Sequence, residues 1–187
     1  CTIGGMVNNN AGGEKSLEYG KTDKYVDKIE FVFADGVKRL VKPLNRTGLI
    51  KKMAQKDFEG KVYREIYELI ESNYDLIKSA KPNVSKDSTG YHLWNVWDRE
   101  TGVFDLNKAI VGAQGTLGLV TRAEFSLVNR RKHSGLLILF LKDIDDLGKL
   151  IPKVLTHKPA TFECFDDATM LLGMKFLPSF LPKLGIK

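Results

Sequence analysis

The sequence predicts an α+β fold, in which a mostly antiparallel sheet is flanked by helices and followed by the start of an α/β domain. Residues 28–41 have a hairpin pattern, residues 59–78 a helical period, and residues 117–128 strand alternation. After Lys132 the pattern changes to strand, helix, strand, which is typical of a crossover unit. We therefore expect two parts, with a linker near 129–134.

The hairpin is predicted from alternation on both sides of a turn signal. Asp35-Gly36 is a strong two-residue turn pair. Apolar residues alternate before the turn, and a second alternating run follows it: Ile29, Phe31 and Phe33, then Val37, Arg39 and Val41. The first glycine-rich segment of the chain therefore precedes a sheet.

One helix is predicted from Glu59 to Lys78. Its apolar residues recur at helical spacing with charged residues opposite, and Lys81-Pro82 follows its end. These apolar residues are Val62, Ile66, Leu69, Ile70 and Ile77. We expect the helix to serve packing and not chemistry.

Residues 117–128 predict an antiparallel strand with one solvated face. The side expected to be buried carries Leu117, Leu119, Thr121, Ala123, Phe125 and Leu127. A glycine-rich segment leads into this strand.

The C-terminal part is predicted to be half of a ferredoxin-like arrangement. Gly135 to Leu141 and Thr161 to Phe165 are the expected strands, with a helix between them that Asp143 caps and Pro152 kinks. Asp166 or Asp167 is expected to cap a further helix through Leu177. The apolar residues of the first helix are Ile144, Leu147, Ile151, Val154 and Leu155.

Composition narrows the function classes. The net charge is +6, but Lys and Arg are dispersed among Asp and Glu, so nucleic-acid binding is disfavoured. Cys1 and Cys164 give no disulfide framework, and no His/Cys cluster predicts a metal site, which favours a reducing compartment. The longest apolar stretch, Leu136 to Leu141, is too short for a transmembrane segment.

The first glycine cluster runs from Thr2 to Gly13 and contains four glycines and three asparagines. Glycine permits positive φ and close backbone approach, and Asn tolerates the left-handed region. Such a segment can direct several backbone N–H groups at one anion. The alternative is a mobile, glycine-rich terminal tail.

A second glycine cluster lies in Val111 to Thr121, where Gly112, Gly115 and Gly118 recur every third residue. The spacing matches neither the Rossmann nor the P-loop pattern. Taken alone, this cluster is more typical of a turn with close strand packing.

Five segments, in order, resemble the FAD-binding domain of the vanillyl-alcohol oxidase (PCMH) type. Within that family they are most similar to the branch of glycolate oxidase flavin subunits and FAD-linked D-lactate and D-2-hydroxyglutarate dehydrogenases. The segments are Ile3 to Gly13, Tyr19-Gly20, Val32 to Gly36, Asp87 to Leu93, and Val111 to Thr121.

The resemblance implies that FAD is the cofactor. It identifies residues 1–130 as the second part of the FAD-binding domain and 131–187 as the beginning of the C-terminal substrate-side domain. The expectation is therefore a piece of a longer protein without the first FAD subdomain. The implied cofactor-binding residues are Ile3, Gly4, Gly5, Asn10, Gly12, Gly13, Gly20, Gln114, Gly115, Gly118 and Val120.

The resemblance also implies a substrate loop. Thr89 is expected to face the substrate carboxylate, with Tyr91 as a weaker candidate. Some relatives have an arginine where this chain has Ser85, so Lys86 is the candidate that replaces it as a point charge. His92, beside Leu93 and Trp94, is more typical of packing than of a base, and the catalytic residues stay unassigned.

The implied activity is FAD-dependent oxidation of a small D-2-hydroxy acid, such as D-lactate, glycolate or 2-hydroxyglutarate, by hydride transfer to the flavin. We expect it in the full-length protein, in the cytoplasm or peripheral to the inner membrane, and not in the isolated piece. A homo-oligomer is compatible with the sequence, and the electron acceptor and any partner subunit stay unassigned. Two alternatives stay open: a non-catalytic FAD- or nucleotide-binding module and, more weakly, a basic RNA-binding module.

Overall fold

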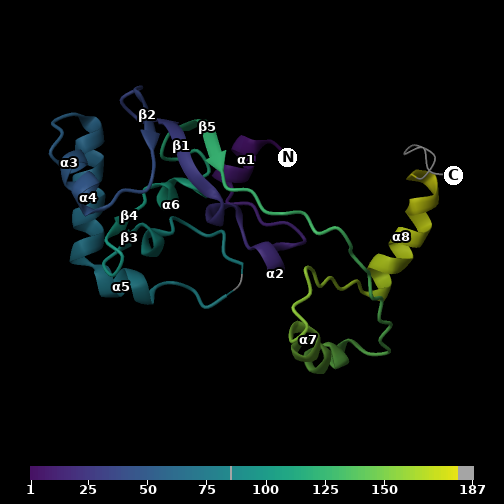
Figure 1. The fold of residues 1–187 in the computed structure, drawn as a ribbon. Coiled ribbons are helices and arrows are strands. Elements are labelled where there is room, and N and C mark those ends of the chain that lie inside the picture. Colours follow the sequence, from purple (N-terminus) through teal and green to yellow (C-terminus); the bar gives the residue numbers. More distant parts are fainter. Residues whose placement is uncertain (85, 181–187) are drawn as a thin grey trace. The chain divides into compact units, whose positions relative to one another are not determined.

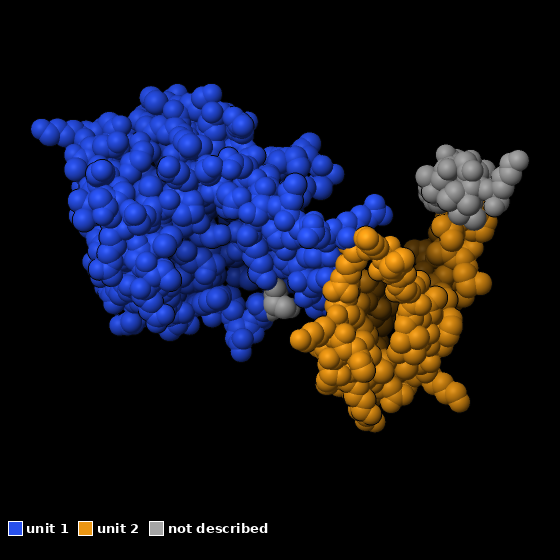
Figure 2. Space-filling view, viewed as in Figure 1, with its two compact units in different colours: residues 1–130 blue, residues 131–187 orange. Residues whose placement is uncertain are grey.

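The computed structural model describes residues 1–84 and 86–180. The chain divides into two compact units, residues 1–130 and residues 131–187 (Figure 2). The first unit holds the sheet and the hydrophobic core.

The first unit is built on a three-stranded antiparallel sheet in the order β2-β1-β5 (Figure 1). β1 (Val26–Val32) and β2 (Lys38–Val41) form the predicted hairpin, and Gly36 takes a φ of 74° in its turn. Alternation places Ile29 and Phe31 in the core, where Phe31 meets Phe33 edge to face at 5.0 Å. The predicted antiparallel α+β fold is confirmed.

β5 (Leu119–Phe125) is the predicted third strand, but the expected buried face is wrong at its start. Glu30 pairs with Arg122 and Phe31 pairs with Val120, so Thr121 is an extra residue that bulges from the ladder. The bulge exchanges the two faces, so Val120 packs on the core and Leu119 is 66% exposed. Sequence alternation cannot show such an insertion.

Two helices replace the single predicted helix over 59–78. α4 (Phe58–Ser72) and α5 (Tyr74–Ser79) are separated by Asn73, whose side-chain amide donates to the carbonyl of Leu69 at 2.9 Å. An Asn side chain that bonds to nearby backbone competes with helical hydrogen bonds. Of the predicted apolar face, Ile70 is fully buried, whereas Leu69 is exposed.

α3 (Arg46–Met53) lies side by side with α4 (Figure 1). Each begins at a side-chain cap: Asn45 accepts the N–H of Gly48 at 2.8 Å, and Asp57 accepts the N–H of Gly60 at 2.9 Å. α4 joins the core through aromatic contacts, such as Tyr63 with Phe104 at 5.7 Å.

Short elements complete the first unit. They are α1 (Ile3–Asn8), α2 (Ser16–Tyr19), η1 (Thr22–Lys24), η2 (Leu93–Asn95), β3 (Trp97–Asp98), β4 (Val103–Phe104) and α6 (Asn107–Ile110). β3 and β4 pair antiparallel, and Phe104 also bridges to Leu44. α6 is almost wholly buried, with contacts to β1 and η2.

The second unit contains η3 (Ile144–Asp146), α7 (Leu147–Leu155) and α8 (Asp167–Phe180). Asp143 caps η3, the 3-10 helix that leads into α7, whereas α7 itself begins without a side-chain cap. The Asp166 carboxylate accepts the N–H of Thr169 at 2.7 Å at the start of α8. The strands predicted at 135–141 and 161–165 are absent from the described residues of this unit. A strand exists only through hydrogen-bonded partners, and no described segment pairs with either run.

Candidate functional site

The first glycine segment is partly helical. Gly4 and Gly5 lie in α1, which the Thr2 hydroxyl caps by accepting the N–H of Gly5 at 3.2 Å. Neither these two glycines nor Gly12 and Gly13 adopt the positive φ that glycine permits. The residue with positive φ is Asn10, at 43°.

Asn10 is 1% exposed and organises the turn after α1. Its Oδ1 accepts the N–H of Asp23 at 3.0 Å, which ties the segment to η1. Its Nδ2 is buried without a hydrogen-bond partner among the described residues. A buried amide donor of this kind is costly unless something accepts from it.

The second glycine segment hydrogen-bonds to the first. The N–H of Gly112 donates to the carbonyl of Val7 at 2.9 Å, and the N–H of Gln114 donates to the carbonyl of Asn8 at 2.9 Å. Gln114 has a φ of 53° and Gly115 a φ of 79°, so the chain turns sharply here. The structure therefore brings the two predicted clusters together.

Three glycines near this junction keep backbone donors free. The N–H groups of Gly12, Gly13 and Gly115 donate to no described residue. A Cβ at Gly13 or Gly115 would meet no atom within 4 Å, so both face open space. Free backbone N–H groups of this kind suit an anionic ligand.

Other predicted cofactor residues have structural roles. A Cβ at Gly118 would lie 2.3 Å from the carbonyl oxygen of Val32, so this glycine permits close packing of β5 on β1. Gly20 has a φ of 76°, and its Cβ position would overlap the side chain of Lys24. Ile3 is exposed on α1, and Val120 lies in β5 against the core.

The predicted substrate loop contacts the second glycine segment and Lys21, which follows the first. Lys21 donates to the carbonyl of Asp87 and, at 2.6 Å, to the hydroxyl of Ser88. At the other end, the hydroxyl of Tyr91 lies 2.7 Å from that of Thr116. Sequence reasoning missed Lys21 and Thr116, because one lysine among many and one threonine after a glycine give no signal.

Within the loop, Thr89 and Lys86 are exposed. The backbone N–H of Thr89 donates to Asp87 at 2.9 Å, and this bond holds the pKa of the Asp87 carboxyl below its usual value. Ser85, the position of the expected arginine, lies outside the described residues.

His92 is 7% exposed and stacks on Trp94 with ring centroids 4.9 Å apart. Its Nε2 lies 3.5 Å from Asp87 Oδ2. This environment agrees with the packing interpretation of His92.

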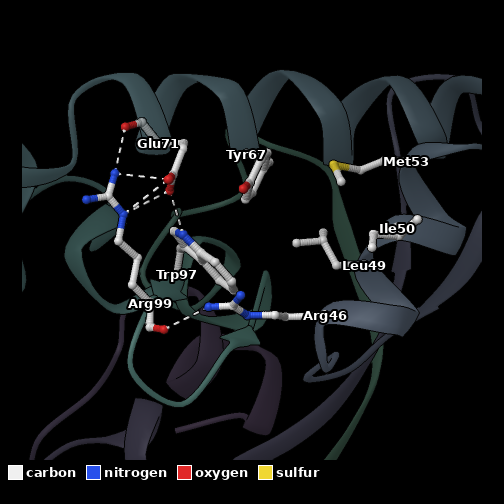
Figure 3. A pocket seen from close by; sticks show the side chains of 8 residues that line it. All are labelled: Arg46, Leu49, Ile50, Met53, Tyr67, Glu71, Trp97 and Arg99. Atoms are coloured by element: carbon white, nitrogen blue, oxygen red, sulfur yellow. Dashed lines mark hydrogen bonds and ion pairs between the residues drawn. The ribbon is translucent and has the colours of Figure 1, made fainter.

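A separate groove of about 330 Å³ lies between α3, α4 and β3 (Figure 3). Glu71 accepts the Trp97 Nε1–H at 2.8 Å and pairs with Arg99 at 3.0 Å, and the hydrogen bond from Arg99 lowers the pKa of Glu71. None of the predicted site residues lines it. The lining residues are Arg46, Leu49, Ile50, Met53, Tyr67, Glu71, Trp97 and Arg99.

Across residues 1–84 and 86–180, no helix is both long enough and apolar enough to span a membrane. The same residues contain no group of three or more His, Cys, Asp or Glu side chains arranged to hold a metal ion.

The sequence is similar to a known family and to several known proteins. Residues 1–40 match a family model described as FAD binding domain. The chain is 32% identical over 175 residues to D-2-hydroxyglutarate dehydrogenase of Pseudomonas putida, a match that covers 94% of the chain and 17% of that protein. Glycolate oxidase subunit GlcD of Bacillus subtilis is 30% identical over 183 residues, covering 97% of the chain and 28% of the subunit.

D-lactate dehydrogenase of Anaerostipes hadrus is 24% identical over 179 residues, covering 95% of the chain and 27% of that protein. The chain thus spans between 17% and 28% of the length of these relatives. The resemblance seen in the sequence is confirmed. The chain is therefore similar, over nearly its whole length, to D-2-hydroxyglutarate dehydrogenases, D-lactate dehydrogenases and glycolate oxidase subunits, and its residues 1–40 match the family described as FAD binding domain.

Proposed function

We propose that this chain supplies part of the FAD site of an oxidoreductase that oxidises a small D-2-hydroxy acid, such as D-lactate, glycolate or D-2-hydroxyglutarate. One observation supports this above the others. The two glycine segments hydrogen-bond to each other and leave the N–H groups of three glycines without an acceptor among the described residues. Lys21, which follows the first segment, and Thr116, in the second, contact the hydroxyl-bearing loop 86–92. The names of the relatives, which are dehydrogenases or oxidases of such acids, support the proposed substrate class.

The residues present fit an anionic cofactor. The free N–H groups of Gly12, Gly13 and Gly115 suit pyrophosphate oxygens, and the buried Nδ2 of Asn10 is a donor that needs an acceptor. The further proposed cofactor residues are Ile3, Gly4, Gly5, Gly20, Gln114, Gly118 and Val120.

When bound, FAD supplies the acceptor for the hydride that leaves the α-carbon of the hydroxy acid. The proposed role of the residues of this chain is to bind and orient the cofactor and the substrate. In the proposal, the Thr89 hydroxyl and the Lys86 ammonium hold the substrate carboxylate, and Tyr91 supports the loop from its far end. We assign no catalytic base in the described residues, since His92 is buried against Trp94.

The domain assignment is also part of the proposal. Residues 1–130 would be the second part of the FAD-binding domain, and residues 131–187 the beginning of the substrate-side domain. We further propose a cytoplasmic enzyme that passes electrons to a separate acceptor.

An absorption spectrum of the whole purified protein tests the proposal. We expect flavin bands that bleach when D-lactate, glycolate or D-2-hydroxyglutarate is added without oxygen. Flavin bands that none of these acids bleaches would indicate a non-catalytic flavin-binding module. A colourless protein that does not take up added FAD would contradict the cofactor assignment, and RNA bound in its place would favour the basic module.

A further inference from the structure

Lys21 has an unusual position for a lysine. It is 8% exposed, whereas lysine side chains are almost always solvated. Its Nζ donates to the carbonyl of Asp87 and to the hydroxyl of Ser88, which lies 2.6 Å away. These contacts join the segment that follows the first glycines to the loop that carries Thr89.

Gly12 provides the space in which the stem of Lys21 lies. A Cβ at Gly12 would be 3.3 Å from Lys21 Cγ and 3.6 Å from the Cβ of Ser16. The aliphatic part of the lysine is therefore packed along the glycine segment, and its ammonium group reaches the loop. Packing of the stem limits the positions that the ammonium can take.

The ammonium depends on its acceptors. Burial lowers the pKa of Lys21, and the charges of Asp23 and Asp87 partly offset that effect. An ammonium removed from water is stable only while it keeps its hydrogen bonds, because an unpaired buried charge is costly. The lysine and the loop backbone therefore hold each other in place.

A second contact fixes the other end of the loop. Thr116 donates its hydroxyl proton to the carbonyl of Ala113 at 2.5 Å, so the Tyr91 hydroxyl is the donor to Thr116 at 2.7 Å. The loop is thus attached to Lys21, whose stem packs beside Gly12, and through Tyr91 to the second glycine segment. Between these attachments Thr89 and Gly90 stay exposed.

We propose that Lys21 is a positioning residue, which holds Asp87 and Ser88 against the first glycine segment and thereby sets the place of Thr89 for substrate binding. The attachment of the loop follows from the contacts alone. The effect on substrate rests on the proposed function.

The first experiment measures hydrogen exchange in the 187-residue chain. Lys21→Met removes the donor and keeps most of the stem, so amides of residues 86–91 should exchange about tenfold faster, while those of β1 keep their protection. Lys28→Met is the matched control, because this substitution removes only a surface ion pair with Glu124. Unchanged exchange in the loop would overturn the attachment.

The second experiment measures kinetics of the whole flavin-loaded protein. Lys21→Met should raise KM for the hydroxy acid about tenfold with kcat within about twofold and flavin content unchanged, because substrate binding and not chemistry is altered. Ser88→Ala should raise KM less and should add little to Lys21→Met, because both remove the same contact. Unchanged KM in Lys21→Met, or additive effects, would overturn the positioning role.

The two experiments separate the two ideas. A wild-type protein without flavin or without hydroxy-acid turnover would refute the proposed function and, with it, the role of Lys21 in substrate placement. The exchange result would still decide whether Lys21 attaches the loop.

Discussion

The backbone N–H of Gly112 donates a hydrogen bond of 2.9 Å to the carbonyl oxygen of Val7. Gly112 has a φ of 90°, and a Cβ there would come within 3.2 Å of the Cβ of Asn10. Close approach of the two glycine segments therefore depends on this residue. This junction sets the place of the free N–H groups proposed to face the cofactor.

A side chain at Gly115 should weaken FAD binding without unfolding the protein. Gly115→Ala adds a Cβ that meets no protein atom, in the space proposed for the cofactor. We expect flavin affinity to fall about tenfold or more, as measured by titration of the whole protein with FAD.

Gly36→Ala is the matched control for this change. Gly36 has a φ of 74°, against 79° for Gly115, and also faces open space, but it lies in the β1-β2 turn. Both variants carry the same backbone strain, so a difference in flavin affinity between them reports the effect of a side chain in the proposed cofactor site. Equal flavin affinities for the two would contradict the proposed site.

Gly118→Ala should destabilise the first unit strongly. Its φ of 151° suits only glycine, and the new Cβ would lie 2.3 Å from the carbonyl oxygen of Val32. We expect the free energy of unfolding to fall by roughly 3 kcal/mol or more in a urea titration. Gly13→Ala, with no atom within 4 Å and no positive φ, should change it by less than about 1 kcal/mol.

Asp105→Asn should change how stability depends on pH. Burial raises the pKa of Asp105, so the folded chain holds this proton more tightly than the unfolded chain does. Its contribution to stability therefore falls as pH rises from the ordinary Asp pKa through the raised value. The free energy of unfolding of Asp105→Asn, relative to that of wild type, should therefore increase as pH rises above the ordinary Asp pKa, as measured by urea unfolding.

Asp35→Asn supplies the opposite case. The hydrogen bond from Arg39 lowers the pKa of Asp35, so this carboxylate stabilises the fold above its unfolded pKa and loses that effect as pH falls through the lowered value. The free energy of unfolding of Asp35→Asn, relative to that of wild type, should therefore decrease as pH rises. The same pH trend in both variants would show that the signs are wrong.

The apolar run Leu136 to Leu141 should cause self-association of the 187-residue chain. Its six residues are between 42% and 84% exposed and carry no charge. Such uncharged runs of high β-propensity pair readily with other chains. Ile138→Lys should therefore lower the mean mass measured by light scattering, whereas Leu76→Lys, at a single exposed leucine on α5, should leave it unchanged.

Local signals explain what the sequence predicted well. The hairpin follows from alternation and from Asp35-Gly36, both of which act over a few residues. The break at Asn73 was missed because a single Asn is tolerated in a helix unless its side chain turns back to the backbone. The strands expected at 135–141 and 161–165 show the same limit, since apolar residues indicate burial but pairing needs a partner.

The sequence indicated which segments form the candidate site, but not their conformation or their contacts. Five matching segments indicated that the glycine clusters belong to one site, and the hydrogen bond from Gly112 to Val7 joins them. The helical state of Gly4 and Gly5 was missed, because glycine has a low helix propensity and the cap at Thr2 was not recognised. Lys21 could not be found, since burial of one lysine depends on tertiary contacts.

The strand order β2-β1-β5 has a consequence for how the chain acquires its structure. β1 pairs with β2 after a short turn, but its other edge pairs with β5, which lies far along the chain, as the contact between Lys28 and Glu124 shows. During synthesis the hairpin can therefore form early, with one edge of β1 open until β5 has left the ribosome. Closure of that edge also completes the junction between the glycine segments, so we expect competence to bind ligand to arise late in folding.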